Sequence, residues 1–236
     1  MKTYRKTAVI AGVLYIIGTV AGVLSLAFSG PIRVEQDVLA SVAANASQVR
    51  IAILCVLVMG LSLAMVPIVL YPILNRFNSI LAIGYVVFRG ALETVGSFVT
   101  PVIWFLLLAL GQLNAQAGDL TSSFQAQGAL LVQAGELSSL AGIVFCLGAA
   151  MFYTVLYQSK LVPRWLAGWG LVAVIPYLAA ESLALFAILG LMSGMASLLC
   201  VPMALQEMVL AVWLIVKGFS PAALASMSTT TATHEA

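Results

Sequence analysis

Charged residues are scarce in this chain, and their scarcity excludes most classes of protein. The 236 residues include 10 Lys and Arg, 8 Asp and Glu, and 63% hydrophobic residues, with a mean hydropathy of +1.13. A soluble domain carries about 25% charged residues, whereas this chain carries 8%. So few charges cannot cover a surface in water, and we therefore predict an integral membrane protein. The net charge of +2 is also too small and too dispersed for a nucleic-acid-binding surface.

Histidines and paired cysteines are also lacking. The single histidine, His234, lies in a polar C-terminal stretch, and Cys55, Cys146 and Cys200 lie in apolar stretches without a CxxC spacing. The chain has no HExxH, GxSxG or P-loop motif, so nucleophilic and metal-dependent catalysis lack their usual residues. We therefore expect no metal site and no cofactor, and an enzyme is the less favoured interpretation.

The apolar residues fall into six stretches that are long enough to cross a lipid bilayer. A hydrocarbon core of about 30 Å needs about 20 residues of helix. The stretches cover residues 8–28, 51–74, 80–110, 137–157, 166–189 and 196–216. We predict an all-α polytopic bundle of six transmembrane helices, which form one domain over residues 1–219. Small polar residues dominate the remainder, and we expect a disordered cytoplasmic tail over residues 220–236.

The basic residues predict the orientation of these helices. In short loops Lys and Arg accumulate on the cytoplasmic side of a membrane. With the N-terminus in the cytoplasm, only Arg33 and Arg50 fall outside. Seven basic residues then fall on the cytoplasmic side: Lys2, Arg5, Lys6, Arg76, Lys160, Arg164 and Lys217. We therefore predict that both termini of the six-helix domain lie in the cytoplasm (N-in/C-in).

Four ionisable residues, Arg89, Glu93, Glu181 and Glu207, lie inside the predicted spans. A charge at the bilayer centre costs about 2.5–3.5 kcal/mol on insertion scales, so such residues mark candidate sites. Arg89 and Glu93 are four residues apart, which places them on one face of a helix. The helical rise puts all four about 13–20 Å from the cytoplasmic ends of their helices. We therefore expect the three helices to meet at this depth.

The charges of these four residues do not balance. One Arg faces three carboxylates, so either a carboxyl holds a proton or the site recruits a cation. Gln206 and Tyr177 lie at similar positions and join Arg89, Glu93, Glu181 and Glu207 as candidate ligand- or ion-binding residues. One interpretation is a small transporter or a proton- or cation-coupled protein, whose ligand is a proton, a cation or a small molecule. The alternative is a non-transporting component, such as a partner subunit or a signalling or stress-response protein, whose polar cluster only fixes the helix register.

Three sequence patterns resemble those of a bacterial membrane family. They are Phe88-Arg89-x-x-x-Glu93, residues 153–170 (YTVLYQSKLVPRWLAGWG), and Pro202-x-x-x-x-Glu207 followed by Trp213-Leu214-Ile215-x-Lys217-Gly218-Phe219. On these patterns the chain resembles the uncharacterised family catalogued as domain of unknown function 4386, over nearly all of its length except the tail. The resemblance implies a six-helix protein of the bacterial inner membrane. It implies no activity, substrate or cofactor.

Overall fold

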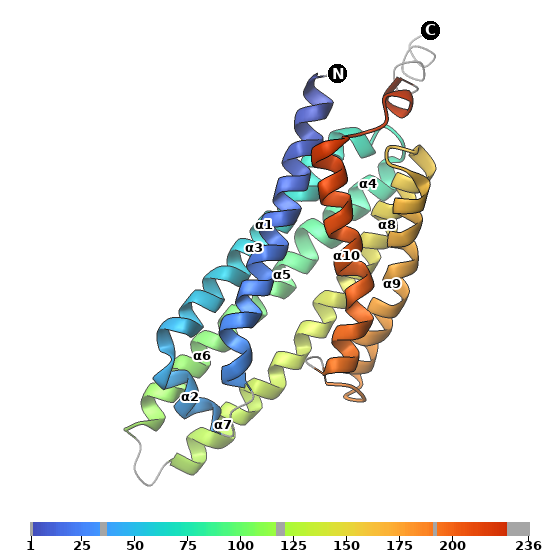
Figure 1. Ribbon diagram of the computed structural model, residues 1–236. Helices are drawn as coiled ribbons and strands as arrows, with labels where there is room; N and C mark the ends of the chain where they lie inside the picture. The colour runs from blue at the N-terminus through green and yellow to red at the C-terminus, as the bar shows by residue number, and fades with distance from the viewer. Residues whose placement is uncertain (1, 34–36, 117–120, 191–192, 226–236) are drawn as a thin grey trace.

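Six long helical columns run side by side in the computed structural model (Figure 1), which describes residues 2–33, 37–116, 121–190 and 193–225. The first is α1 (Lys2–Arg33), and the second is α3 (Ala46–Leu74), with the short helix α2 (Val38–Ala44) between them in sequence. The last two are α9 (Arg164–Leu185) and α10 (Gly194–Val216). Four of the six columns are thus single, uninterrupted α-helices.

The third and fourth columns are composite. The third consists of α4 (Ser79–Tyr85), the π-helical segment η1 (Val86–Leu92), α5 (Glu93–Ser97) and α6 (Val99–Asn114). The fourth consists of α7 (Thr121–Ala134), a 3₁₀ turn η3 (Gly135–Ser138) and α8 (Ser139–Ser159). At 36 and 39 residues, the third and fourth columns are longer than the predicted spans 80–110 and 137–157.

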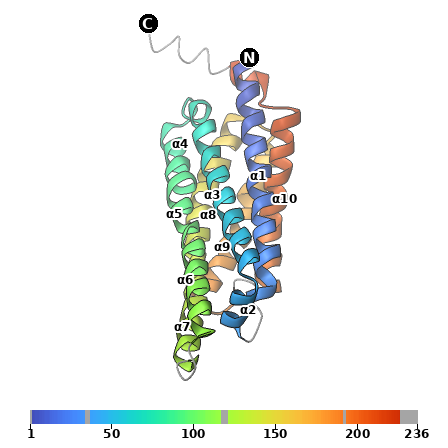
Figure 2. The same ribbon diagram turned by 90° about the vertical axis from the view of Figure 1, so that its left-hand side faces the viewer.

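All six columns are long and apolar enough to cross a membrane, and the described residues contain no strand. The prediction of an all-α bundle with six membrane-spanning helices is therefore confirmed, and the chain is a multi-pass membrane protein. Helix α1 begins and α10 ends at the same end of the bundle (Figures 1 and 2). The N-in/C-in orientation and the identity of the membrane stay predictions.

The end of the fifth span and the start of the predicted tail also differ from the structure. The fifth span ends at Leu185 and not at residue 189, because the chain turns at Ala187, which has a φ of 54°. The predicted tail begins too early, since residues 221–225 are helical and Ala223 is 7% exposed. Ser220 and Pro221 are favourable residues for a helix start. The rest of the predicted tail, residues 226–236, lies outside the described residues.

The packing of α1 depends on residues without side chains. A Cβ at Gly12 would lie 2.6 Å from the carbonyl oxygen of Ala211 on α10, and one at Gly18 would lie 2.6 Å from the Leu63 side chain on α3. Such close approach of small residues is the usual way in which membrane helices associate, because lipid supplies no hydrophobic force between them. Helix α1 therefore packs tightly against α3 on one side and α10 on the other.

The buried apolar side chains of the described residues form two cores. The larger one joins α1, α3, α4, α8, α9 and α10. The smaller one is formed by Leu39 and Val42 of α2 with residues of α3 and α6, and α7 packs against it. In both views α2, α6 and α7 form a projection beyond the ends of α9 and α10 (Figure 2). The intramembrane charges lie in the main bundle, whereas the second core supports this projection.

Candidate functional site

The third column changes its helical form around Arg89. In η1 the Glu93 N–H donates to the carbonyl oxygen of Phe88, five residues earlier in the chain. Such π turns are rare and often mark functional sites. The segment lies directly against α8, because a Cβ at Gly148 would be 3.0 Å from the Arg89 nitrogen and 3.1 Å from its Cβ. The sequence thus places a wide helical turn, and a glycine opposite to it, at the position of the buried Arg89.

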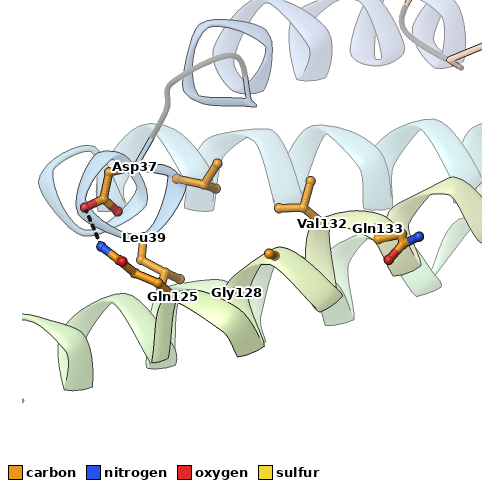
Figure 3. Close-up of a pocket in the computed structure, with 8 residues that line it drawn as sticks. Asp37, Leu39, Gln125, Gly128, Val132 and Gln133 are labelled. Atoms are coloured by element: carbon orange, nitrogen blue, oxygen red, sulfur yellow. Dashed lines mark hydrogen bonds between the residues drawn. The ribbon is translucent and has the colours of Figure 1, made fainter. Parts of the chain in front are cut away.

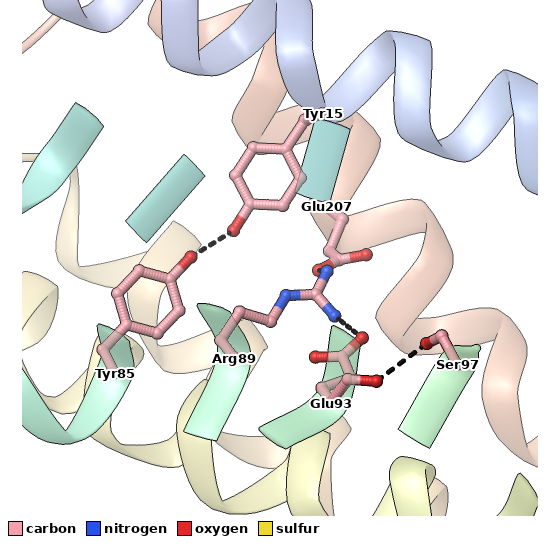
Figure 4. Close-up of polar contacts among 6 residues, drawn as sticks. All are labelled: Tyr15, Tyr85, Arg89, Glu93, Ser97 and Glu207. Carbon is pink, nitrogen blue, oxygen red and sulfur yellow. Dashed lines mark hydrogen bonds and ion pairs between the residues drawn. The ribbon is translucent and has the colours of Figure 1, made fainter. Parts of the chain in front are cut away.

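Arg89 joins two carboxylates from different parts of the chain (Figure 4). Its Nη1 donates to Oε1 of Glu93, as the i, i+4 spacing predicts, and its Nη2 donates to Oε1 of Glu207 on α10 at 3.1 Å. The Arg89 side chain is 4% exposed, against 15% for Glu93 and 14% for Glu207. We refer to these three residues as the Arg89 cluster.

Aromatic side chains surround this cluster. The Arg89 guanidinium lies 4.5 Å from the ring centroid of Phe145 on α8, a cation–π geometry. The hydroxyl oxygens of Tyr15 and Tyr85 lie 3.0 Å apart beside the cluster (Figure 4). Ser97 also belongs to this region, but its hydroxyl donates to the backbone oxygen of Glu93 at 2.9 Å and not to the carboxylate. The guanidinium is therefore enclosed by rings and carboxylates contributed by several helices.

The Arg89 cluster has one more acidic group than basic groups. With both glutamates ionised it would carry a net charge of −1 in a region of low dielectric constant. Oε2 of Glu93 is buried and has no hydrogen-bond partner in the described part of the chain. A buried polar atom without a partner is uncommon and calls for an explanation. One proton on this carboxyl would remove the excess charge.

Glu181 lies outside this cluster. Its carboxyl group packs on Gly142 of α8, where a Cβ would be 2.3 Å from Cδ of Glu181. Gly142 precedes Gly148 by six residues, so Glu181 lies about 9 Å along α8 from Arg89. The Glu181 side chain is buried and makes polar interactions of its own. The structure thus brings three of the four intramembrane charges together and places the fourth in a separate position.

Tyr177 lies on the same helix as Glu181, and Phe145 connects it to the cluster. Its ring packs against Phe145 in a tilted arrangement, with centroids 4.9 Å apart. Phe145 therefore contacts both Tyr177 and the guanidinium of Arg89. The hydrogen bonds among the described residues include none from Tyr177 to the Arg89 cluster.

Gln206 connects three helices. It is fully buried, its Oε1 accepts from the Tyr153 hydroxyl of α8, and its Nε2 donates to the backbone oxygen of Leu166 on α9 at 3.0 Å. Gly170 allows this arrangement, because a Cβ there would lie 2.4 Å from the Tyr153 ring. Gln206 precedes Glu207 in sequence, yet its side-chain hydrogen bonds go to α8 and α9 and hold these helices to α10.

Sequence reasoning missed the aromatic partners of the cluster. Tyr85 precedes Arg89 by four residues, and that spacing alone would have placed both side chains on one helix face. Tyr15 and Phe145 had no such signal, because they come from α1 and α8 and only the tertiary packing brings them to Arg89. The π-helical form of η1 also had no recognisable sequence pattern.

A cavity of about 490 Å³ lies in the projection between α2 and α7 (Figure 3). Its lining includes Asp37, Leu39, Gln125 and Gly128. The Asp37 carboxylate caps α2 by accepting from the Ala40 N–H at 3.0 Å, and its second oxygen accepts from Nε2 of Gln125 at 3.4 Å. Both carboxylate oxygens therefore have donors, so the Arg89 cluster is the stronger candidate site.

Among the comparisons with known proteins, one family model matches the chain. No curated protein and no solved structure matches the chain. The family described as "Domain of unknown function (DUF4386)" matches residues 10–218. This range contains all three residues of the Arg89 cluster and extends from α1 to just beyond the end of α10. The chain therefore belongs to the DUF4386 family.

Proposed function

We propose that this membrane protein is proton-coupled and that the Arg89 cluster is the site where a proton binds and is released. The cluster would link its protonation to the passage of that proton, or of a small solute, through the bundle. The observation that carries this proposal is the Oε2 atom of Glu93, which is buried beside a guanidinium already shared by two carboxylates and has no hydrogen-bond partner in the described residues.

The ligand set favours a proton over a metal cation. Ca²⁺ takes 6–8 oxygen ligands and Mg²⁺ requires six in a near-ideal octahedron. The cluster offers one oxygen that is buried and unpartnered, and the neighbouring Ser97 hydroxyl is oriented toward a backbone oxygen. A proton needs a single acceptor and would remove the net charge of −1. Glu93 and Glu207 are therefore the proposed acceptors, and Arg89 orients them.

A second candidate function is supported by the packing of the same residues. Arg89 makes an ion pair with each carboxylate, and Gly148 brings η1 into close contact with α8. Polar groups of this kind fix the register of membrane helices. The protein would then be a non-transporting component, a partner subunit or a signalling protein, whose cluster holds the third column against α8 and α10.

The arrangement of basic residues supports the N-in/C-in orientation, with the bacterial inner membrane as the proposed location. Seven Lys and Arg residues lie in the first turns of α1, follow α3 and α10, or flank the connection from α8 to α9, which puts them at one end of the bundle. Arg33 and Arg50 belong to the opposite end. This bias follows the positive-inside rule.

Proton flux into proteoliposomes tests the proposal. The purified protein is reconstituted around a pH-sensitive dye, and a potassium diffusion potential set by valinomycin drives protons inward. We expect dye acidification with the native chain and its loss with Glu93→Gln and with Glu207→Gln. Asp37→Asn is the matched control, because it removes a carboxylate in the projection, and it should retain the flux.

Thermal unfolding of the same samples separates the two candidates. If either glutamine variant stays folded and still conducts protons at the native rate, the proposed site is wrong. If the native protein shows no flux while both glutamine variants unfold at lower temperature, the structural function is supported.

A further inference from the structure

Two buried tyrosines next to the Arg89 cluster share one hydrogen bond. Tyr15 on α1 and Tyr85 on α4 are each 1% exposed, and their hydroxyl oxygens lie 3.0 Å apart. Either oxygen can be the donor. The Tyr85 ring is held in place by stacking on Phe152 of α8, with centroids 4.4 Å apart and planes inclined by 10°. The two hydroxyl groups are thus fixed opposite each other, but the direction of their hydrogen bond is not.

The two tyrosines carry one more hydroxyl hydrogen than their shared hydrogen bond uses. Two hydroxyl groups carry two hydrogens, and one of these lies between the two oxygens. Neither hydroxyl has another hydrogen-bond partner within the described residues. The second hydrogen is therefore an unused donor in a buried position, where an unused donor is costly. It belongs to Tyr85 when Tyr15 donates, and to Tyr15 when Tyr85 donates.

The charges of the Arg89 cluster act on this pair. Arg89, Glu93 and Glu207 are the charged side chains that lie beside the two tyrosines (Figure 4). Figure 4 shows the two hydroxyl groups facing each other to one side of the Arg89 side chain. From α8, Tyr153 is the further titratable group that acts on Tyr15. Tyr153 differs from the pair because its own hydrogen already has an acceptor, Oε1 of Gln206.

We infer that the Tyr15–Tyr85 pair is a reversible hydrogen-bond relay that responds to the charge of the Arg89 cluster. When both carboxylates are ionised, the cluster is negative and favours the arrangement that points the spare hydrogen toward it. When the cluster holds a proton, that preference is lost and the reverse arrangement becomes populated as well. The reversal needs only rotation of the two O–H groups about their C–O bonds, so no bond to hydrogen breaks. The inference rests on the proposed proton binding and adds two positioning residues to it.

Infrared difference spectroscopy of the full chain in lipid bilayers tests the relay. Spectra recorded across a pH series report carboxylic C=O bands and tyrosine C–O–H bands separately. In the native protein we expect tyrosine bands that change at the same midpoint pH as the carboxyl band. Tyr15→Phe and Tyr85→Phe should each abolish the pH-dependent tyrosine bands while the carboxyl band still titrates. Glu207→Gln should remove both signals.

Tyr153→Phe is the matched control, because Tyr153 is equally buried but has a fixed acceptor, and it should leave the pH-dependent tyrosine bands unchanged. The two test variants retain the aromatic rings and hence the stacking on Phe152, and thermal unfolding checks that each is folded. If one does not fold, the other gives the same test. A titrating carboxyl band without accompanying tyrosine bands overturns the relay alone. A native spectrum without any titrating carboxyl band overturns the relay together with the proposed proton site.

Discussion

Gly170 on α9 lies directly beneath the ring of Tyr153 on α8, and it provides a direct test of how tightly these helices pack. A Cβ at this position would lie 2.4 Å from Cδ1 and 2.6 Å from Cγ of that ring. The ring has no room to move away, because it is 1% exposed, its hydroxyl is bonded to Gln206, and it packs against Phe152. Gly170→Ala must therefore push α8 and α9 apart.

The expected loss of stability follows from three contributions. Overpacking of a core costs about 1–3 kcal/mol, and weakening the Tyr153–Gln206 hydrogen bond adds about 1 kcal/mol. Replacing glycine by alanine inside a helix stabilises that helix by about 1 kcal/mol, which offsets part of this loss. The free energy of unfolding should therefore fall by about 1–3 kcal/mol. At about 2–4 °C per kcal/mol for a chain of this size, the Tm should fall by about 2–12 °C.

Thermal unfolding in a mild detergent, followed by tryptophan fluorescence, measures this change. Gly168→Ala on the same helix is the matched control, because a Cβ there would lie 3.7 Å from Tyr157, an ordinary contact. This variant should be as stable as the native chain or more so. Truncation of the ring by Tyr153→Ala should also make Gly170→Ala harmless in the double variant. A Gly170→Ala protein as stable as Gly168→Ala would refute the packing argument.

Two further stability predictions use the same assay. Arg5→Ala should lower the free energy of unfolding by about 1 kcal/mol, since the Arg5 guanidinium donates to the last carbonyl oxygens of α10 at 2.6–3.2 Å. Lys6 is the neighbouring exposed cation, and Lys6→Ala should leave the free energy of unfolding unchanged. Arg89→Met should cost about 3–5 kcal/mol, because it leaves buried carboxylates without their partner. Adding Glu93→Gln and Glu207→Gln should restore most of that loss, and a triple variant no more stable than Arg89→Met would contradict this explanation.

The sequence was most informative about position along each helix. Counting residues placed Arg89, Glu93 and Glu207 at a common depth, and the structure joins them in one cluster. The same count placed Glu181 with them, but its carboxyl packs on Gly142 of α8 instead. Depth depends only on the rise per residue, whereas the direction of a side chain depends on how each helix is rotated against its neighbours. One sequence does not determine that rotation.

The conformation of the third column was beyond sequence reasoning for a related reason. A long apolar stretch is equally compatible with an α-helix and with a helix that contains a π segment, because both keep the backbone hydrogen-bonded within lipid. In this protein the π segment packs closely on Gly148 of α8, a tertiary contact that the sequence alone does not reveal. The aromatic residues around the guanidinium were missed likewise, since Tyr15 and Phe145 lie far from Arg89 in sequence.

The π segment η1 also affects how related sequences should be compared. A helical wheel drawn through the third column assumes one constant turn, but residues 86–92 have a wider one. Faces assigned to α4 therefore cannot be extended to α6 across this segment. A relative that gains or loses one residue there would turn the α6 half by about 100° relative to α4. Alignments within the family should accordingly treat the residues before and after η1 as two separate blocks.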